Sequence, residues 1–98
     1  MVKIEKVLKN VSLKDFNVDS KGFWVRTKIV MQFVSLREKM NLTQNDVALK
    51  MGVMRQQITR FENLNNSPTI TFLVKYANAL DTEIDVLVKG VHLQEITN

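Results

Sequence analysis

Cysteine is absent from the 98-residue chain, and histidine occurs once. The first absence excludes disulfide bonds, thiolate zinc sites and a cysteine nucleophile, and it is typical of the reducing cytoplasm, where we expect this protein. The second excludes a metal site with two imidazole ligands. No apolar run reaches the 18 or so residues that cross a bilayer, and lysines interrupt the first 13 residues. We therefore expect neither a membrane span nor a signal peptide.

Proline and glycine are also scarce, at one and three residues, while 45% of the chain is hydrophobic. Such a composition indicates a folded chain rather than a disordered one. A chain of this length makes one domain with a small core, and contact with a second copy would add stability.

Charge is unevenly distributed along the chain. Residues 1–25 carry five lysines against three acids, residues 26–64 carry seven lysines and arginines against three acids, and residues 65–98 carry two lysines against four acids. The basic character of a chain with a net charge of +4 therefore lies in its middle. This asymmetry indicates a nucleic-acid surface beside a protein-binding one, and an evenly solvated surface is the alternative.

Apolar residues recur at helical spacing over residues 26–40. Four of them follow one another at intervals of four, three and four positions, which places them on one face of a helix. They are Ile29, Phe33, Leu36 and Met40. Asn41 comes next, and asparagine tolerates the left-handed conformation in which many helices end.

Two short, closely connected helices are predicted next. Thr43 and Asp46 have roughly the spacing and chemistry of a capping box, which predicts a helix over 44–51. Gly52 follows at its end, where a positive φ costs little. Another helix is predicted over 54–63, with a polar face rich in long hydrogen-bond donors. A connection this short makes two helices cross at a steep angle.

The last third of the chain predicts one more helix and a strand. Thr69 follows a turn-rich loop and can cap a helix over about 70–80. Residues 83–89 then place apolar side chains at period two, which favours a strand, with a short helix as the competing interpretation. The apolar positions are Ile84, Val86 and Val88.

The middle of the chain resembles a known family. The segment LREKMNLTQNDVALKMGVMRQQITRFEN, followed by SPTITFLVKYANAL, is similar to the helix-turn-helix domain of the Cro/cI-repressor (XRE) family. The resemblance covers about residues 28–88 and combines L-T-Q, V-A, M-G-V, I-x-x-F-E-N and A-x-A-L at family spacing. It implies a mainly α, lambda-repressor-like bundle of about five helices. We expect an N-terminal extension at 1–25, a DNA-binding domain at 26–82, and a dimerisation strand and tail at 83–98.

The resemblance also implies which residues touch DNA. Gln44, at the start of the second helix of the motif, matches a position that contacts phosphate, as an amide and free N–H groups at a helix N-terminus can. The N-terminal residues of a recognition helix enter the major groove, where arginine can read guanine and glutamine can read adenine. The side chains expected at bases or phosphates are Arg55, Gln56, Gln57, Thr59 and Arg60, with Asn63 at the DNA backbone.

Arg37 and Glu62 match a pair that bridges the first helix of the motif and the end of the recognition helix, and we expect a structural ion pair. Two residues depart from the family pattern. Met54 stands where Ser or Thr usually caps the recognition helix, and losing such a cap costs about 1 kcal/mol. Leu64 replaces the usual glycine after Glu-Asn, so the loop there is expected to differ in shape.

Both ends of the chain resemble parts of HigA-type antitoxins. These are small helix-turn-helix proteins that neutralise an mRNA-cleaving toxin of the RelE/HigB fold and repress their own operon. The aromatic stretch FWVRTKIVMQFVSLREKMNLTQ and the terminal EIDVLVK carry this resemblance. It implies a transcriptional repressor that is the antitoxin of a type II toxin–antitoxin pair, with an RNase toxin as its partner. We expect no cofactor.

The N-terminal aromatic residues are the expected toxin contact. Aromatic anchors dominate interface energies, so we expect Phe16, Phe23 or Trp24 to hold the toxin. The charge of +2 over residues 1–25 does not suit an electrostatic plug for a basic RNase. For Trp24, ordinary core packing is an equal alternative.

A homodimer is expected on physical grounds. One recognition helix covers too few base pairs for useful specificity, so we expect two copies on an inverted repeat of double-stranded DNA. Ile84, Val86 and Val88 offer an apolar stripe and an unpaired strand edge for the dimer interface.

Three alternatives remain open at this point. The chain can be a stand-alone XRE-family regulator of a phage or mobile element. An enzyme is disfavoured, since the sequence offers no nucleophile–base pair and no glycine-rich phosphate loop, and Asp81, Glu83 and Asp85 would simply share the solvent side of a strand. A protein-interaction adaptor with a degenerate DNA face is disfavoured by the retained Gln44 and Arg55.

Overall fold

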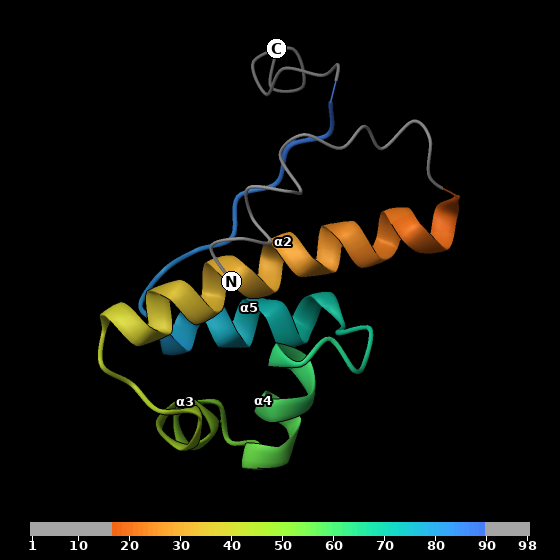
Figure 1. Cartoon of the computed structure of the whole chain (residues 1–98). Coiled ribbons are helices and arrows are strands. Elements are labelled where there is room, and N and C mark those ends of the chain that lie inside the picture. The colour runs from red at the N-terminus through yellow and green to blue at the C-terminus, as the bar shows by residue number, and fades with distance from the viewer. Residues whose placement is uncertain (1–16, 90–98) are drawn as a thin grey trace, which may run out of the picture.

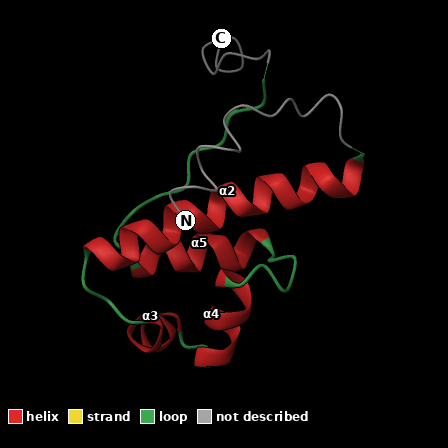
Figure 2. Cartoon of the chain, viewed as in Figure 1, coloured by secondary structure: helices red, strands yellow, loops and turns green. Residues whose placement is uncertain are grey.

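The computed structural model describes residues 17–89, and in that stretch the chain forms four α-helices and no β-strand. The helices are α2 (Val18–Lys39), α3 (Gln44–Met51), α4 (Arg55–Glu62) and α5 (Ile70–Ala79). Figure 1 shows the long α2 and α5 on one side of the molecule and the two short helices on the other. Figure 2 shows the described connections between the helices as loops and turns. The mainly α fold class is therefore confirmed.

Aromatic rings from three helices form the centre of the core. The ring centroid of Tyr76 in α5 lies 4.6 Å from that of Phe33 in α2 and 5.3 Å from that of Phe61 in α4. Phe72 adds a further contact, 5.2 Å from Phe61. Val47 brings α3 into the same core and is fully buried, as Tyr76 is. The short helices are thus held in place by side chains that cannot leave the core without losing this packing.

The starts of α3 and α5 follow from their capping residues. The Thr43 hydroxyl accepts from the backbone N–H of Asp46 at 3.0 Å, and the Asp46 carboxylate accepts from the backbone N–H of Thr43 at 2.8 Å. Thr69 caps α5 by accepting from the N–H of Phe72 at 3.0 Å. At the other end of α3, Gly52 has a φ of 71°, which glycine adopts without strain.

Within residues 17–89, three residues other than glycine take left-handed backbone conformations where the chain turns: Asn41, Leu64 and Asp81. Asn41, with a φ of 58°, follows the end of α2, as its side chain allows. Leu64, which stands where the family usually has glycine, has a φ of 62° in the turn after α4. Its side chain packs against the core, which offsets the strain of this conformation for a branched residue.

The first helix differs from the prediction at its start. It begins at Val18 rather than at residue 26, so the boundary placed at residue 25 falls inside α2. Gly22 makes this stretch a weak helix former, and the apolar spacing that marked residues 26–40 does not extend through it. Asn17 nevertheless caps the helix by accepting from the N–H of Ser20 at 2.8 Å, and Trp24 is buried, at 9% exposed.

The strand predicted over residues 83–89 is not formed, and neither is the competing short helix. A strand needs a hydrogen-bonded neighbour, and no other segment within residues 17–89 is extended beside this one. Ile84, Val86 and Val88 are exposed, at 39%, 74% and 68%. The predicted count of about five helices also differs from the four helices that this part of the chain contains.

Candidate nucleic-acid interface

Helices α3 and α4 form a compact pair joined by three residues. Figure 1 shows α3 nearly end-on beside α4, so that the two helix axes cross steeply. Val47 on α3 and Ile58 on α4 are fully buried. Because both helices turn their apolar faces inward, the remaining faces and the first turn of each helix are left at the surface.

The outer face of α4 consists of long polar side chains. Its inner face holds Ile58 and Phe61, which are 0% and 1% exposed. The side chains of Arg55, Gln56 and Arg60 are exposed and form no hydrogen bond with any other part of residues 17–89. Their donors are therefore available to an external ligand.

Gln57 has a different role from its neighbours. Met54 precedes α4 and has no polar side-chain atom to cap it. The backbone N–H of Met54 instead donates to Oε1 of Gln57 at 3.0 Å. Gln57 is thus partly engaged in holding the start of α4, and its amide group keeps only N–H donors free.

Gln44 and Thr59, two of the predicted DNA contacts, are bonded to each other. The Thr59 hydroxyl donates to Oε1 of Gln44 at 2.7 Å, and Nε2 of Gln44 donates to Oε1 of Glu62 at 3.0 Å. Both side chains are partly buried between α3 and α4. Asn63, by contrast, is exposed at the C-terminal end of α4.

Arg37 and Glu62 form a bidentate ion pair between α2 and α4. The Arg37 Nε and Nη2 atoms donate to Oε2 and Oε1 of Glu62 at 2.9 and 2.8 Å. The Tyr76 hydroxyl donates to Oε2 of the same carboxylate at 2.6 Å. Nothing in the motif comparison pointed to Tyr76. The available signal was that a tyrosine on the apolar face of a helix must find a partner for its hydroxyl.

These contacts determine the charge states at this site. Burial would raise the pKa of the Glu62 carboxyl, but hydrogen bonds from Arg37, Tyr76 and Gln44 outweigh it and hold the pKa below its usual value. Burial and the adjacent carboxylate raise the pKa of the Tyr76 hydroxyl far above its usual range. Glu62 is therefore an anion and Tyr76 a neutral donor at neutral pH.

A hollow of about 460 Å³ lies between the turn before α3 and the start of α4. Its lining includes Gln44 and Asn45 from the first turn of α3, and Arg55 from the first turn of α4. The first backbone N–H groups of a helix have no partner within that helix, and Thr43 occupies only that of Asp46. The carboxylate of Glu38 also lines the hollow, but the two free N–H groups at this helix N-terminus and the guanidinium of Arg55 suit a phosphate.

The N-terminal aromatic residues divide into three cases. Phe16 lies outside the described residues. Phe23 is 49% exposed, and the guanidinium of Arg26 lies 5.9 Å from its ring centroid. Trp24 is buried, so its ring is not presented at the surface.

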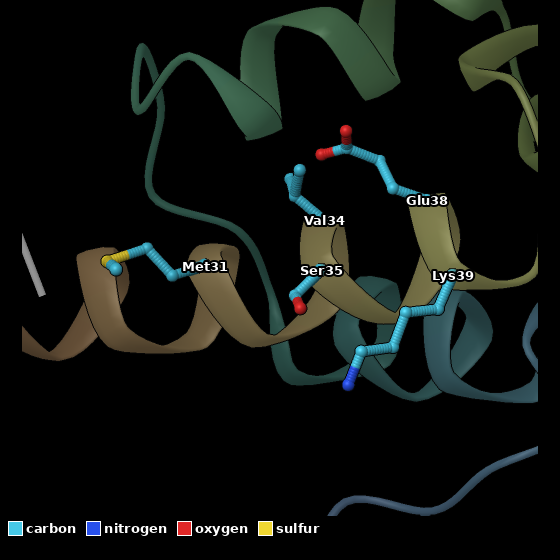
Figure 3. A pocket seen from close by; sticks show the side chains of 5 residues that line it. All are labelled: Met31, Val34, Ser35, Glu38 and Lys39. Atoms are coloured by element: carbon cyan, nitrogen blue, oxygen red, sulfur yellow. The ribbon is translucent and has the colours of Figure 1, made fainter. Parts of the chain in front are cut away.

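A second hollow, of about 400 Å³, lies along α2. Figure 3 shows that Met31, Val34, Ser35, Glu38 and Lys39 line it from this one helix, with the two charged side chains pointing apart. No set of polar groups converges on one point there. Within residues 17–89 no cluster of His, Asp or Glu could hold a metal ion, and no helix is long and apolar enough to cross a membrane.

Comparisons with known proteins agree with this geometry. The helix-turn-helix family model matches residues 35–87 of the chain. Antitoxin HigA1 of Mycobacterium tuberculosis is 30% identical over 69 residues, which make up 70% of this chain and 46% of that protein. The uncharacterized HTH-type transcriptional regulator YqaE of Bacillus subtilis is 35% identical over 54 residues, 55% of this chain and 47% of that protein. The chain spans about half the length of these curated relatives, and no solved structure matches it.

Proposed function

Since the chain belongs to the helix-turn-helix family, we propose that it binds double-stranded DNA sequence-specifically and represses transcription. The family and the relatives indicate a DNA-binding regulator and not an enzyme. The observation that carries the proposal is the outer face of α4. Arg55, Gln56 and Arg60 present unengaged donors there, on a helix whose inner face is held in the core by Ile58 and Phe61.

In the proposed complex, α4 enters the major groove with its N-terminal end first. Arg55 donates two hydrogen bonds to N7 and O6 of a guanine, and Gln56 reads N7 and N6 of an adenine. Arg60, one turn further along, reaches a base edge or a phosphate. Asn63 lies beyond the end of the helix and contacts the DNA backbone.

The start of α3 is the proposed phosphate site. The hollow beside Gln44, Asn45 and Arg55 offers N–H donors and a positive charge to one phosphate group. Residues 26–64 carry seven lysines and arginines against three acids, which adds a sequence-independent attraction to the DNA. Affinity should therefore fall steeply as the salt concentration rises.

We further propose that two copies bind an inverted repeat, with half-sites about 34–36 Å apart or a multiple of that distance. The segment over residues 83–89 supports this assembly, because it forms neither a strand nor a helix in the single chain. Its side chains Ile84, Val86 and Val88 are exposed. In the described part of the chain its only backbone hydrogen bond is local, from the Val86 N–H to the Asp85 carboxylate at 3.0 Å, so the segment suits pairing with the same segment of a second copy.

An antitoxin role is the finer part of the proposal, and the similarity to Antitoxin HigA1 supports it. In this role the protein would neutralise an mRNA-cleaving toxin and repress the operon that encodes both. Phe23, half-exposed on the first turns of α2, is then the aromatic anchor. The burial of Trp24 favours a packing role for that residue instead. The similarity to YqaE favours the alternative, a stand-alone transcriptional regulator.

The test of DNA binding is selection of bound duplexes from a randomised pool, followed by a gel shift with the selected sequence. We expect an inverted repeat to emerge and to compete at least ~1,000-fold better than random duplex. Recovery of random sequences would contradict the proposal. Co-expression with the product of the adjacent reading frame then separates the two roles, since an antitoxin restores growth that this product arrests.

A further inference from the structure

Four helices meet at the carboxylate of Glu62 at the end of α4. Its Oε1 atom accepts from Arg37 of α2 at 2.8 Å and from Gln44 of α3 at 3.0 Å. Its Oε2 atom accepts from Arg37 at 2.9 Å and from Tyr76 of α5 at 2.6 Å. An ionised carboxylate has about four acceptor positions, so this one is fully occupied. Glu62 is therefore an internal hub with no remaining acceptor for an external donor.

This hub determines which way the amide of Gln44 faces. A carboxylate can only accept, so Glu62 requires the Nε2 side of the amide. On its other side, the Thr59 hydroxyl donates to Oε1 at 2.7 Å. A flipped amide would set its oxygen against the carboxylate and lose the hydrogen bond to Glu62. The Thr59 hydroxyl would then have to turn its donor from Gln44 to the Arg55 carbonyl, 3.2 Å away. One of the two N–H groups on Nε2 donates to Glu62, and the second stays free.

The second N–H of Gln44 is the donor that this side chain has left for the hollow where the proposed phosphate would bind. Gln44 lines this hollow together with Arg55. Tyr76 is fully buried in α5 and cannot touch DNA itself. Thr59 is partly buried, with its hydroxyl directed to Gln44.

We propose that Tyr76 and Thr59 are positioning residues that, together with Glu62, hold the free N–H of Gln44 ready for a DNA phosphate. The proposal rests on the proposed DNA binding and names residues of α4 and α5 that act on it without contacting bases. Tyr76 acts through Glu62, because its hydroxyl supplies one of the four hydrogen bonds that set the carboxylate against Gln44. Thr59 acts directly on the amide oxygen.

A network that served stability alone would behave differently. Its loss would lower the free energy of unfolding, but the protein that remained folded would bind DNA with unchanged affinity. A positioning network loses affinity in the folded protein, and only as long as Gln44 is present to be positioned. The two roles are separated by a double-mutant cycle on DNA affinity.

The experiment compares the full chain with Tyr76→Phe, Gln44→Ala and the double variant, each checked by circular dichroism to be folded. Tyr76→Phe keeps the aromatic ring in the core and removes only the hydroxyl. We expect Gln44→Ala to weaken binding to the selected duplex roughly tenfold, the size of one hydrogen bond to a charged group. Tyr76→Phe should weaken it by a few-fold, and the double variant should bind no worse than Gln44→Ala alone.

Two further variants serve as matched comparisons. Thr59→Val preserves shape, removes the other hydroxyl and should also be non-additive with Gln44→Ala. Phe72→Leu loosens the same core but has no bond to the hub, so its DNA affinity should equal that of the unsubstituted protein. If the fold-losses of affinity of the two single variants multiply in the double variant, or if Tyr76→Phe and Phe72→Leu bind DNA with equal affinity, the positioning role is overturned. Either result leaves the proposed DNA binding standing. Failure of the unsubstituted chain to bind any selected duplex would instead overturn the proposed function and this inference with it.

Discussion

Arg37 and Glu62 face each other through two hydrogen bonds of 2.9 and 2.8 Å, with side chains only 12% and 5% exposed. The Arg37 guanidinium also donates to the backbone carbonyl of Leu42 at 2.9 Å. One side chain of α2 therefore holds both the end of α4 and the turn before α3. These are the two elements that set the angle between the helices of the motif.

Glu62→Gln should destabilise the fold markedly. The amide leaves Arg37 without its anionic partner and turns an N–H₂ group toward a donor, and breaking one side of a buried pair costs about 3–5 kcal/mol. Urea unfolding followed by circular dichroism measures this change. Glu38→Gln, at an exposed position of α2, is the matched control and should change the free energy of unfolding by less than about 0.5 kcal/mol. Equal values for the two variants would show that the pair is not structural.

Stability should fall in acid, with a contribution from Glu62. Burial would raise the pKa of this carboxyl, but hydrogen bonds hold it below its ordinary value of 4.5. A group whose pKa is depressed by folding stabilises the protein above its unfolded pKa, and this contribution disappears as the pH falls through the folded pKa. The free energy of unfolding should therefore decline as the pH drops below about 4.5.

In Glu62→Gln this decline should be shallower, though not absent. Hydrogen bonds from Thr43 lower the pKa of Asp46 as well, so that carboxylate still contributes. Urea unfolding at several pH values from neutral to acid provides both profiles. Parallel profiles would mean that Glu62 has the same pKa in the folded and unfolded chains.

Met54→Ser should stabilise α4. Met54 precedes this helix with an extended backbone, is 63% exposed and offers no side-chain cap. The backbone N–H of Gln57 already donates to the Met54 carbonyl at 2.9 Å, so a serine hydroxyl there can accept from the N–H of Gln56 and add about 1 kcal/mol to the free energy of unfolding. Met54→Ala removes the same methionine contacts without supplying an acceptor, so it is the control. If serine and alanine give the same stability, the cap does not form.

Val86→Asp should convert the proposed dimer to a monomer. The side chain is 74% exposed in the single chain, so the change has little effect on the folded protomer, but a charge there would be buried between two copies. Sedimentation velocity at micromolar concentration should show a dimer for the unsubstituted chain and a monomer for the variant. Glu83→Asp, in the same segment, retains the charge and should remain dimeric. A monomeric unsubstituted chain would contradict the proposed assembly.

Features that depend on neighbouring residues were readable from the sequence. Capping chemistry alone marks both ends of α3, with Thr43 and Asp46 at its start and Gly52 at its end. Asn41 has a left-handed backbone, as its side chain permits. The start of α2 was missed because Gly22 and the lack of apolar spacing conceal eight residues of helix. The cap at Asn17 and the burial of Trp24 both agree with a helix over these residues. Neither of them produces a periodic pattern of apolar residues in the sequence.

Features that depend on distant residues were not readable in the same way. The alternation of apolar and polar residues over 83–89 shows which side chains could share one face of a strand. A strand also requires a neighbouring strand to pair with, and residues 17–89 provide none. The bond between Gln44 and Thr59 is a second example, since the fold brings together two side chains that are 15 positions apart in the sequence. Tyr76 reaches Glu62 only because α5 folds back across the core.

Base reading by α4 can be measured by parallel binding-site selection with the unsubstituted chain and Arg55→Ala. Arg55 is exposed at the start of α4 with no competing partner in the described chain, so its removal should cost about 1–3 kcal/mol and relax the preference at one base pair of each half-site. Lys75→Ala removes the same charge from α5 and should leave the preference intact. The Arg55→Ala consensus should lack one guanine that the unsubstituted chain selects in each half-site. An identical consensus for both proteins would contradict base reading by this helix.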